Sequence, residues 1–170
     1  FGSRMIETVS VLGGAGFLNP RFLRTLSGEI RRLGTVPATG FSAAAARLPH
    51  ATGVIDDRGA VSFGELNRRG NAIANGLRAA GVSPGDSVGL MCRNHRGFVE
   101  SAIALGKLGV NALLLNTGFA GPQLRDVLAR EGATALIYDE EFEALLAGGG
   151  AEKRFVAWHE GRPEAATLDE

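Results

Sequence analysis

The chain has 170 residues, no formal net charge at pH 7 and 45% hydrophobic residues, which suits one globular domain and leaves too little length for two large ones. Because no excess of basic residues is present, the composition lacks the electrostatic pattern of a nucleic-acid-binding protein, and we expect no nucleic-acid partner. The single cysteine, Cys92, excludes an intrachain disulfide, and its apolar neighbours predict a buried structural thiol rather than a nucleophile.

The N-terminal region begins with residues that we exclude from the fold. Residues 1–4, ahead of Met5, look like a cloning remnant. An apolar run over residues 8–12 leads into Gly-Gly-Ala-Gly at 13–16, which resembles the glycine turn of the short-chain dehydrogenases. The third glycine and the later acidic residue of that fingerprint are absent, so an NAD(P)-binding domain is only the third interpretation.

Two helices are predicted before residue 50. Asn19 as N-cap and Pro20 at the first helical position begin a helix that Gly34 ends. Its apolar residues form one face, with the arginines mostly off that face. A basic amphipathic helix can lie on an anionic membrane, although packing on its own domain is the commoner case. A shorter helix is predicted over residues 42–48.

A β-hairpin and a capped helix follow. Residues 53–56 and 60–61 predict two short strands joined by the tight turn Asp-Arg-Gly. Ser62 and Glu65 form a capping-box pattern at the start of an apolar-periodic run. Gly81 stands where a helix ends with a glycine in the C′ position.

Strands and helices then alternate. Residues 88–92 form a short apolar run without alternation, as in a strand buried on both faces. Asn94 can cap the next helix, and residues 109–117 follow as a strand and a turn. A helix from Pro122 to Glu131 is followed by a strand over 135–138. This alternation of strands and helices predicts an α/β fold with a mostly parallel sheet flanked by helices.

The C-terminal part is predicted to hold two further elements. Asp139 can cap a short acidic helix that ends at the glycine triplet 148–150, and residues 154–158 form a last strand. We therefore divide the chain into residues 1–4, a helical lead-in at 5–50, an α/β subdomain at 51–158 and a loose tail at 159–170.

Three stretches in this order resemble one family, the AMP-forming acyl-CoA synthetases of the adenylate-forming superfamily. Residues 61–66 (Val-Ser-Phe-Gly-Glu-Leu) are similar to the opening Leu-Thr-Tyr-x-Glu-Leu motif. Residues 81–88 (Gly-Val-Ser-Pro-Gly-Asp-Ser-Val) are similar to the family's Gly-Val-x-Pro-Gly-Asp-x-Val turn, and residues 105–112 resemble its second core motif. Residues 93–95 match the asparagine-led turn between them. The resemblance covers about residues 54–138 and looks most like bacterial fatty-acid–CoA ligases.

The resemblance implies the N-terminal subdomain of an enzyme with a two-step reaction. A carboxylate attacks the α-phosphate of ATP, giving an acyl-adenylate and pyrophosphate, and the CoA thiol then displaces AMP. ATP, Mg²⁺ and CoA would serve the full-length enzyme, with a fatty or other carboxylic acid as substrate. The family's Ser/Thr/Gly-rich phosphate loop, later nucleotide motifs and C-terminal lysine do not occur here. We expect an inactive N-terminal fragment with no catalytic residue, metal site or bound cofactor; the alternative is a non-catalytic scaffold or regulatory module.

Asn116 and Thr117 are the only candidates for cofactor binding, because they lie just past the end of a predicted parallel strand. Many relatives carry Pro-Arg directly after this asparagine, where the arginine can meet a CoA phosphate, but Thr117 and Gly118 stand there. A turn-capping Asn-Thr pair is the simpler interpretation. His95 could also reach a ligand from a helix N-terminus, although a surface turn is favoured.

The expected compartment is the cytoplasm, since no apolar run reaches membrane-spanning length and no cleavage site follows the N-terminal apolar stretch. Peripheral membrane contact stays open because of the basic helix. A homodimer stays open because a half-built sheet would leave an edge and an apolar face uncovered.

Overall fold

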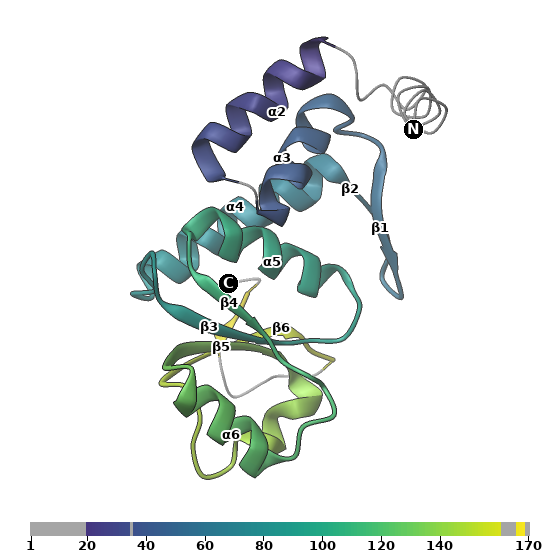
Figure 1. Ribbon diagram of the computed structural model, residues 1–170. Coiled ribbons are helices and arrows are strands. Elements are labelled where there is room, and N and C mark those ends of the chain that lie inside the picture. The colour runs from purple at the N-terminus through teal and green to yellow at the C-terminus, as the bar shows by residue number, and fades with distance from the viewer. Residues whose placement is uncertain (1–19, 35, 161–165, 169–170) are drawn as a thin grey trace, which may run out of the picture.

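A parallel sheet forms the centre of the chain in the computed structural model, which describes residues 20–34, 36–160 and 166–168 (Figure 1). Its strands are β3 (Ser87–Met91), β4 (Asn111–Leu114), β5 (Ala133–Asp139), β6 (Lys153–Trp158) and β7 (Ala166–Thr167). Their order is β4-β3-β5-β6-β7, and every neighbouring pair is parallel. The predicted α/β fold is confirmed. Strand β7 is not among the predicted elements; it pairs with β6 through only two residues.

Helices cover both faces of this sheet, which is why β3 and β5 are apolar without alternation. Helices α4 (Phe63–Ala79) and α5 (Arg96–Leu108) lie on one face, where their apolar residues pack against Val88, Leu90 and Ile137. Helix α6 (Gly121–Arg130) and the 3₁₀ helix η1 (Glu140–Leu146) lie on the other, against Met91 and Leu136 (Figure 1).

The N-terminal helices and the hairpin pack beside α4 and α5. They are α2 (Pro20–Leu33), α3 (Pro37–Arg47), β1 (Thr52–Asp56) and β2 (Gly59–Ser62). The predicted hairpin is confirmed, with Ile55 opposite Ala60. The predicted start of α3 at residue 42 is wrong: the helix begins at Pro37, because proline suits the first helical turn, where its missing N–H costs nothing. A small apolar cluster of Ala38, Val61, Leu66 and Ile103 joins these segments to the rest.

Both predicted ends of α4 are confirmed. The Ser62 hydroxyl accepts a hydrogen bond from the backbone N–H of Glu65 at 3.2 Å. Gly81 has φ +83°, the left-handed conformation that follows many helices. None of the helices in the described ranges is long and apolar enough to cross a bilayer. The glycine turn at 13–16 and the Asn19 cap lie outside the described residues.

Candidate functional site

The candidate site lies at the carboxyl edge of the sheet, where strand order reverses. The chain leaves β3 for β4 on one side and returns to β5 on the other. In open α/β sheets, ligands bind in the crevice outside the carboxyl ends of the strands at such a reversal. Here a cavity of about 400 Å³ is lined by the hairpin turn at 55–57, residues 93–95, Asp139, Glu141 and Trp158.

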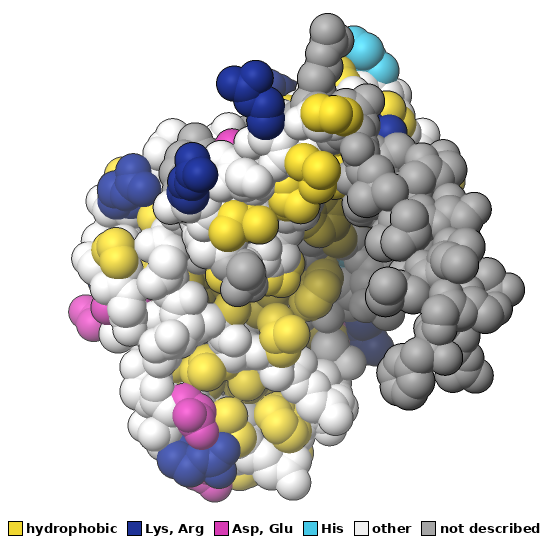
Figure 2. Space-filling view, turned by 45° about the horizontal axis from the view of Figure 1, so that its top comes forward, with side chains coloured by type: hydrophobic (Ala, Val, Ile, Leu, Met, Phe, Trp, Pro, Cys, Tyr) yellow, Lys and Arg dark blue, Asp and Glu magenta, His cyan; other side chains and the backbone are white. Residues whose placement is uncertain are grey.

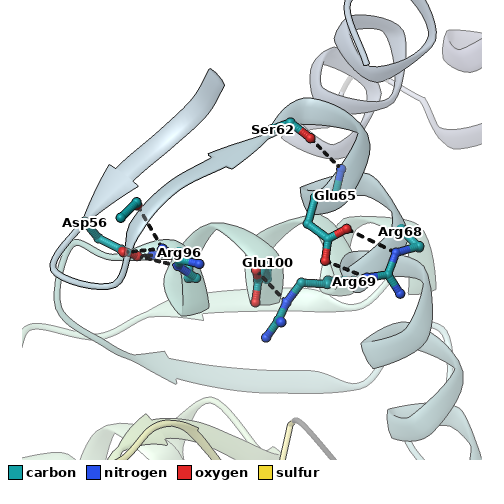
Figure 3. A network of polar contacts seen from close by, with 8 residues as sticks. Asp56, Ser62, Glu65, Arg68, Arg69, Arg96 and Glu100 are labelled. Carbon is teal, nitrogen blue, oxygen red and sulfur yellow. Dashed lines mark hydrogen bonds and ion pairs between the residues drawn. The ribbon is translucent and has the colours of Figure 1, made fainter. Parts of the chain in front are cut away.

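The hairpin contributes Asp56, which caps helix α5 from a distant part of the sequence (Figure 3). Its carboxylate accepts hydrogen bonds from the backbone N–H of Arg96 at 2.9 Å and from Nε and Nη2 of the same arginine at 2.8 and 2.6 Å. The backbone N–H of Arg58 donates to it at 3.0 Å. The hydrogen bonds from the Arg96 side chain, above all, hold the pKa of Asp56 well below its usual range. The hairpin turn is therefore fixed to the start of α5.

The loop after β3 meets the end of β5 through a buried pair. His95 Nε2 lies 3.0 Å from Asp139 Oδ2, and the two side chains are only 9% and 3% exposed. The backbone N–H of Arg93 donates to the same carboxylate oxygen at 2.6 Å. The imidazole also stacks on Trp158, with ring centroids 4.4 Å apart. Three strands thus contribute to one packed cluster.

Two predicted caps are wrong at this point. Helix α5 has His95, not Asn94, at its N-cap, and the helix N-terminus is satisfied by Asp56. Asp139 precedes η1 without a side-chain capping bond, because its carboxylate is taken by Arg93 and His95. The preference for His95 as a surface-turn residue is also wrong, since its side chain is largely buried.

Two arginines contact residues that line the cavity. Arg93 donates from Nε and Nη2 to the two carboxylate oxygens of Glu141 at 2.9 and 2.8 Å. These hydrogen bonds lower the pKa of Glu141. The Arg58 guanidinium lies 3.7 Å from the centroid of the Trp158 ring and donates to the carbonyl of His159 at 2.7 Å. The cavity is therefore lined by paired charges and an indole.

The cluster offers no activated nucleophile. Burial raises the pKa of the Cys92 thiol, and the neighbouring Asp139 raises it further, so the expected structural thiol is confirmed. A carboxylate only accepts hydrogen bonds, which places the proton of the His95–Asp139 contact on Nε2. The other ring nitrogen, Nδ1, is buried and lacks a hydrogen-bond partner in the described part of the chain; it faces Gly97. The pair therefore fixes the loop after β3 to the end of β5.

The predicted site residues, Asn116 and Thr117, do not line this cavity. They follow β4 in a turn, where Asn116 Oδ1 accepts from the backbone N–H of Gly118 at 2.8 Å and the Asn116 carbonyl from that of Phe119 at 3.1 Å. The turn interpretation accounts for Asn116, and a ligand-binding role stays a prediction. Sequence reasoning missed Asp56 and Trp158. Asp139 was given only a capping role, although its position at the end of a buried strand is a signal for a site residue.

Comparison with known proteins identifies the family. A family model described as AMP-binding enzyme matches residues 41–167. The chain belongs to the AMP-binding enzymes. It is 41% identical over 99 residues to a feruloyl-CoA synthase of an Amycolatopsis species, a match covering 58% of this chain and 20% of that protein. It is 36% identical over 120 residues to mouse long-chain fatty acid transport protein 1, and that match covers 69% of this chain and 18% of that protein.

Solved structures with a similar fold include the N-terminal subdomain of another protein. The N-terminal subdomain of Klebsiella oxytoca NpsA, solved in complex with anthranilyl-AMSN, matches with a TM-score of 0.63 at 20% identity, covering 78% of this chain and 37% of that one. The resemblance to the N-terminal portion of an AMP-forming acyl-CoA synthetase is thereby confirmed. The chain spans about a fifth of the length of these curated relatives.

Proposed function

We propose that these residues form the N-terminal part of an ATP-dependent acid–CoA ligase. In that reaction a carboxylate attacks the α-phosphate of ATP to give an acyl-adenylate and pyrophosphate, and the thiol of CoA displaces AMP to give a thioester. The observation that carries the proposal is the AMP-binding family match over residues 41–167, which the 41% identity to a feruloyl-CoA synthase supports.

The substrate in this proposal is a carboxylic acid with a large apolar body. The sequence resemblance favours a fatty acid, and the name of the long-chain fatty acid transport protein agrees with it. The name of the feruloyl-CoA synthase instead favours an aryl-propenoic acid. A panel containing both kinds of acid therefore separates the two substrate classes.

The described residues do not fit a magnesium site. No group of three or more His, Cys, Asp or Glu side chains suited to a metal is found in the described ranges. At the carboxyl edge, Asp56 forms an ion pair with Arg96 and Glu141 forms one with Arg93, so both carboxylates are already neutralised by arginines. In the proposal, this chain supplies the sheet and the wall at its carboxyl edge, with Asn116 and Thr117 as its contacts to the cofactor. ATP and Mg²⁺ would be held by residues outside these 170, so the isolated chain would be inactive. The proposed compartment is the cytoplasm.

The experiment has two arms. With the full-length enzyme, pyrophosphate release from ATP is measured with a fatty-acid series and with hydroxycinnamic acids, and thioester formation is measured after CoA is added. We expect release that depends on one of these acids. If no acid supports release, the ligase proposal fails.

The second arm is calorimetric titration of the 170-residue chain with ATP·Mg²⁺ and, separately, with CoA. We expect no heat with ATP, because the chain has no Ser/Thr/Gly-rich phosphate loop. Clear ATP binding would contradict the assignment of the nucleotide site to other residues, and residues 13–16 would then be the first to mutate.

A further inference from the structure

The apolar side chains of helix α2 are divided between two surfaces. Phe22 is buried, and Leu33 packs against the small cluster around Ala38 and Ile103. Leu23 and Ile30 are instead 44% and 39% exposed. Seven residues, close to two helical turns, separate Leu23 from Ile30, so the two lie on the same side of the helix. The fold of the described residues leaves this second apolar stripe in contact with solvent.

Basic side chains accompany this stripe. Arg24 and Arg31 directly follow Leu23 and Ile30, are exposed, and are themselves two turns apart. Ser27 lies between the two pairs, is exposed, and donates its hydroxyl to the Leu23 carbonyl at 2.7 Å. Figure 2 turns the end of the molecule that carries α2 toward the viewer and shows Lys and Arg side chains beside hydrophobic ones there. We call residues Leu23, Arg24, Ser27, Ile30 and Arg31 the α2 stripe.

The charge of the region is unlike that of the whole chain. Residues 20–47 contain five arginines and one glutamate, a net charge of +4, whereas the complete chain is neutral. The one acidic residue, Glu29, is half-buried, and the Arg47 guanidinium lies 5.4 Å from the centroid of the Phe22 ring. A locally basic, partly apolar helical surface on a neutral protein is complementary to an anionic, apolar partner.

We propose that the α2 stripe docks on a lipid bilayer surface that contains anionic lipids. Helices that lie in the plane of the interface place Leu and Ile below the headgroups and keep Lys and Arg at the level of the phosphates. Each basic residue near an anionic bilayer favours binding, and the exposed apolar side chains add partition energy. A nucleic acid would match the arginines but leave Leu23 and Ile30 exposed to water. This inference is independent of the proposed ligase reaction.

The first experiment is vesicle flotation of the 170-residue chain. Vesicles of phosphatidylcholine alone are compared with vesicles that also contain phosphatidylserine. We expect binding to the anionic vesicles, weakened by salt because the charges are exposed. The double variant Arg24→Gln/Arg31→Gln should reduce vesicle affinity about thirty-fold. The matched control, Arg68→Gln/Arg130→Gln, removes two exposed arginines from α4 and α6 and should leave the affinity unchanged.

A second pair of variants tests the apolar part. Leu23→Ser/Ile30→Ser should weaken binding to the anionic vesicles about tenfold or more. Its control, Ile55→Ser/Leu114→Ser, removes two exposed apolar side chains that lie on β1 and β4. Because all four residues are exposed, circular dichroism should show the same fold in both double variants.

The third measurement locates the contact. Cys92 is buried, so an environment-sensitive fluorophore reacts selectively with a cysteine introduced by Ser27→Cys on α2 or Ala129→Cys on α6. We expect an emission blue-shift on anionic vesicles for the α2 label and none for the α6 label. The proposal is overturned if the wild-type chain does not bind anionic vesicles, if the control pairs lose as much affinity, or if the α2 label shows no shift. It is also overturned if the arginine pair changes binding to a nucleic-acid duplex and not to vesicles.

Discussion

At the scale of single residues, Asp56 joins the hairpin turn to the N-terminus of α5. Its side chain is only 4% exposed and receives hydrogen bonds from two arginines. Because it belongs to the hairpin while Arg96 begins α5, its loss would free both the hairpin turn and the helix N-terminus. A buried, hydrogen-bonded carboxylate of this kind is costly to neutralise.

Asp56→Asn keeps the size of the side chain and removes its charge. We expect the variant to be less stable at neutral pH by about 2 kcal/mol, because hydrogen bonds to a charged group are replaced by neutral ones. The folded-state pKa of Asp56 lies below its unfolded value, so its stabilisation is complete above the unfolded pKa of about 4 and is lost as the pH falls toward the folded pKa. Urea unfolding should therefore show a smaller difference in the free energy of unfolding between wild type and variant near pH 3 than at neutral pH.

The control for this prediction is Asp57→Asn, which changes the exposed neighbour in the same turn. It should leave the free energy of unfolding nearly unchanged. If the loss of unfolding free energy in Asp56→Asn were the same at both pH values, the charge of Asp56 would not be what stabilises the contact between the hairpin and α5.

At the scale of elements, the contact between α4 and α5 sets how closely the helices lie over the sheet. A Cβ atom on Gly70 would stand 2.5 Å from Cγ2 of Ile103, closer than real atoms approach. Next to Gly70 in α4, Arg69 Nε lies 2.8 Å from Oε1 of the buried Glu100 on α5 (Figure 3). A glycine and a half-buried ion pair thus define this helix contact. Gly76, in the same helix, has no atom within 4 Å of where its Cβ would be.

These two glycines give a matched pair of substitutions. Gly70→Ala should destabilise the protein by about 1–3 kcal/mol, because the added methyl group forces Ile103 or the α5 backbone to move. Gly76→Ala should stabilise it by up to about 1 kcal/mol, because alanine favours a helix and the site is open. Thermal unfolding of both variants measures the difference. Equal effects of the same sign would contradict the packing described here.

At the scale of the whole molecule, β4 forms one edge of the sheet, with no strand on its outer side among the described residues. Leu114, its last residue, is 67% exposed. An exposed edge strand with an apolar side chain can pair with another chain. This edge is therefore where we expect two chains to meet in the predicted homodimer.

Leu114→Lys should weaken self-association of the isolated chain about tenfold or more, since it places a charge where an apolar side chain would be buried. Light scattering over a concentration series measures the change. Ile55→Lys, which alters an exposed apolar residue on the hairpin, serves as the control and should have no such effect. A wild-type chain that stays monomeric at high concentration would refute the prediction.

Most of the local elements can be predicted from short-range sequence patterns alone. The Ser62 cap, the Gly81 helix end, the hairpin and the buried strands β3 and β5 all depend on residues within a few positions of one another, so their patterns are readable in one dimension. The spaced motifs around them also sufficed to indicate the AMP-forming synthetases, which the family match confirmed.

The side-chain partners at the carboxyl edge depend on the tertiary fold. Asp56 and Arg96 are 40 residues apart, and His95 and Asp139 are 44 apart. Local reasoning gave Asn94 and Asp139 capping roles because such residues commonly cap the helix that follows them. The sheet order instead brings the ends of β3, β5 and β6 together, where a carboxylate gains more from a buried imidazole or guanidinium than from a nearby backbone amide. Strand order is set by the packing of both sheet faces, and no short stretch of sequence contains that information.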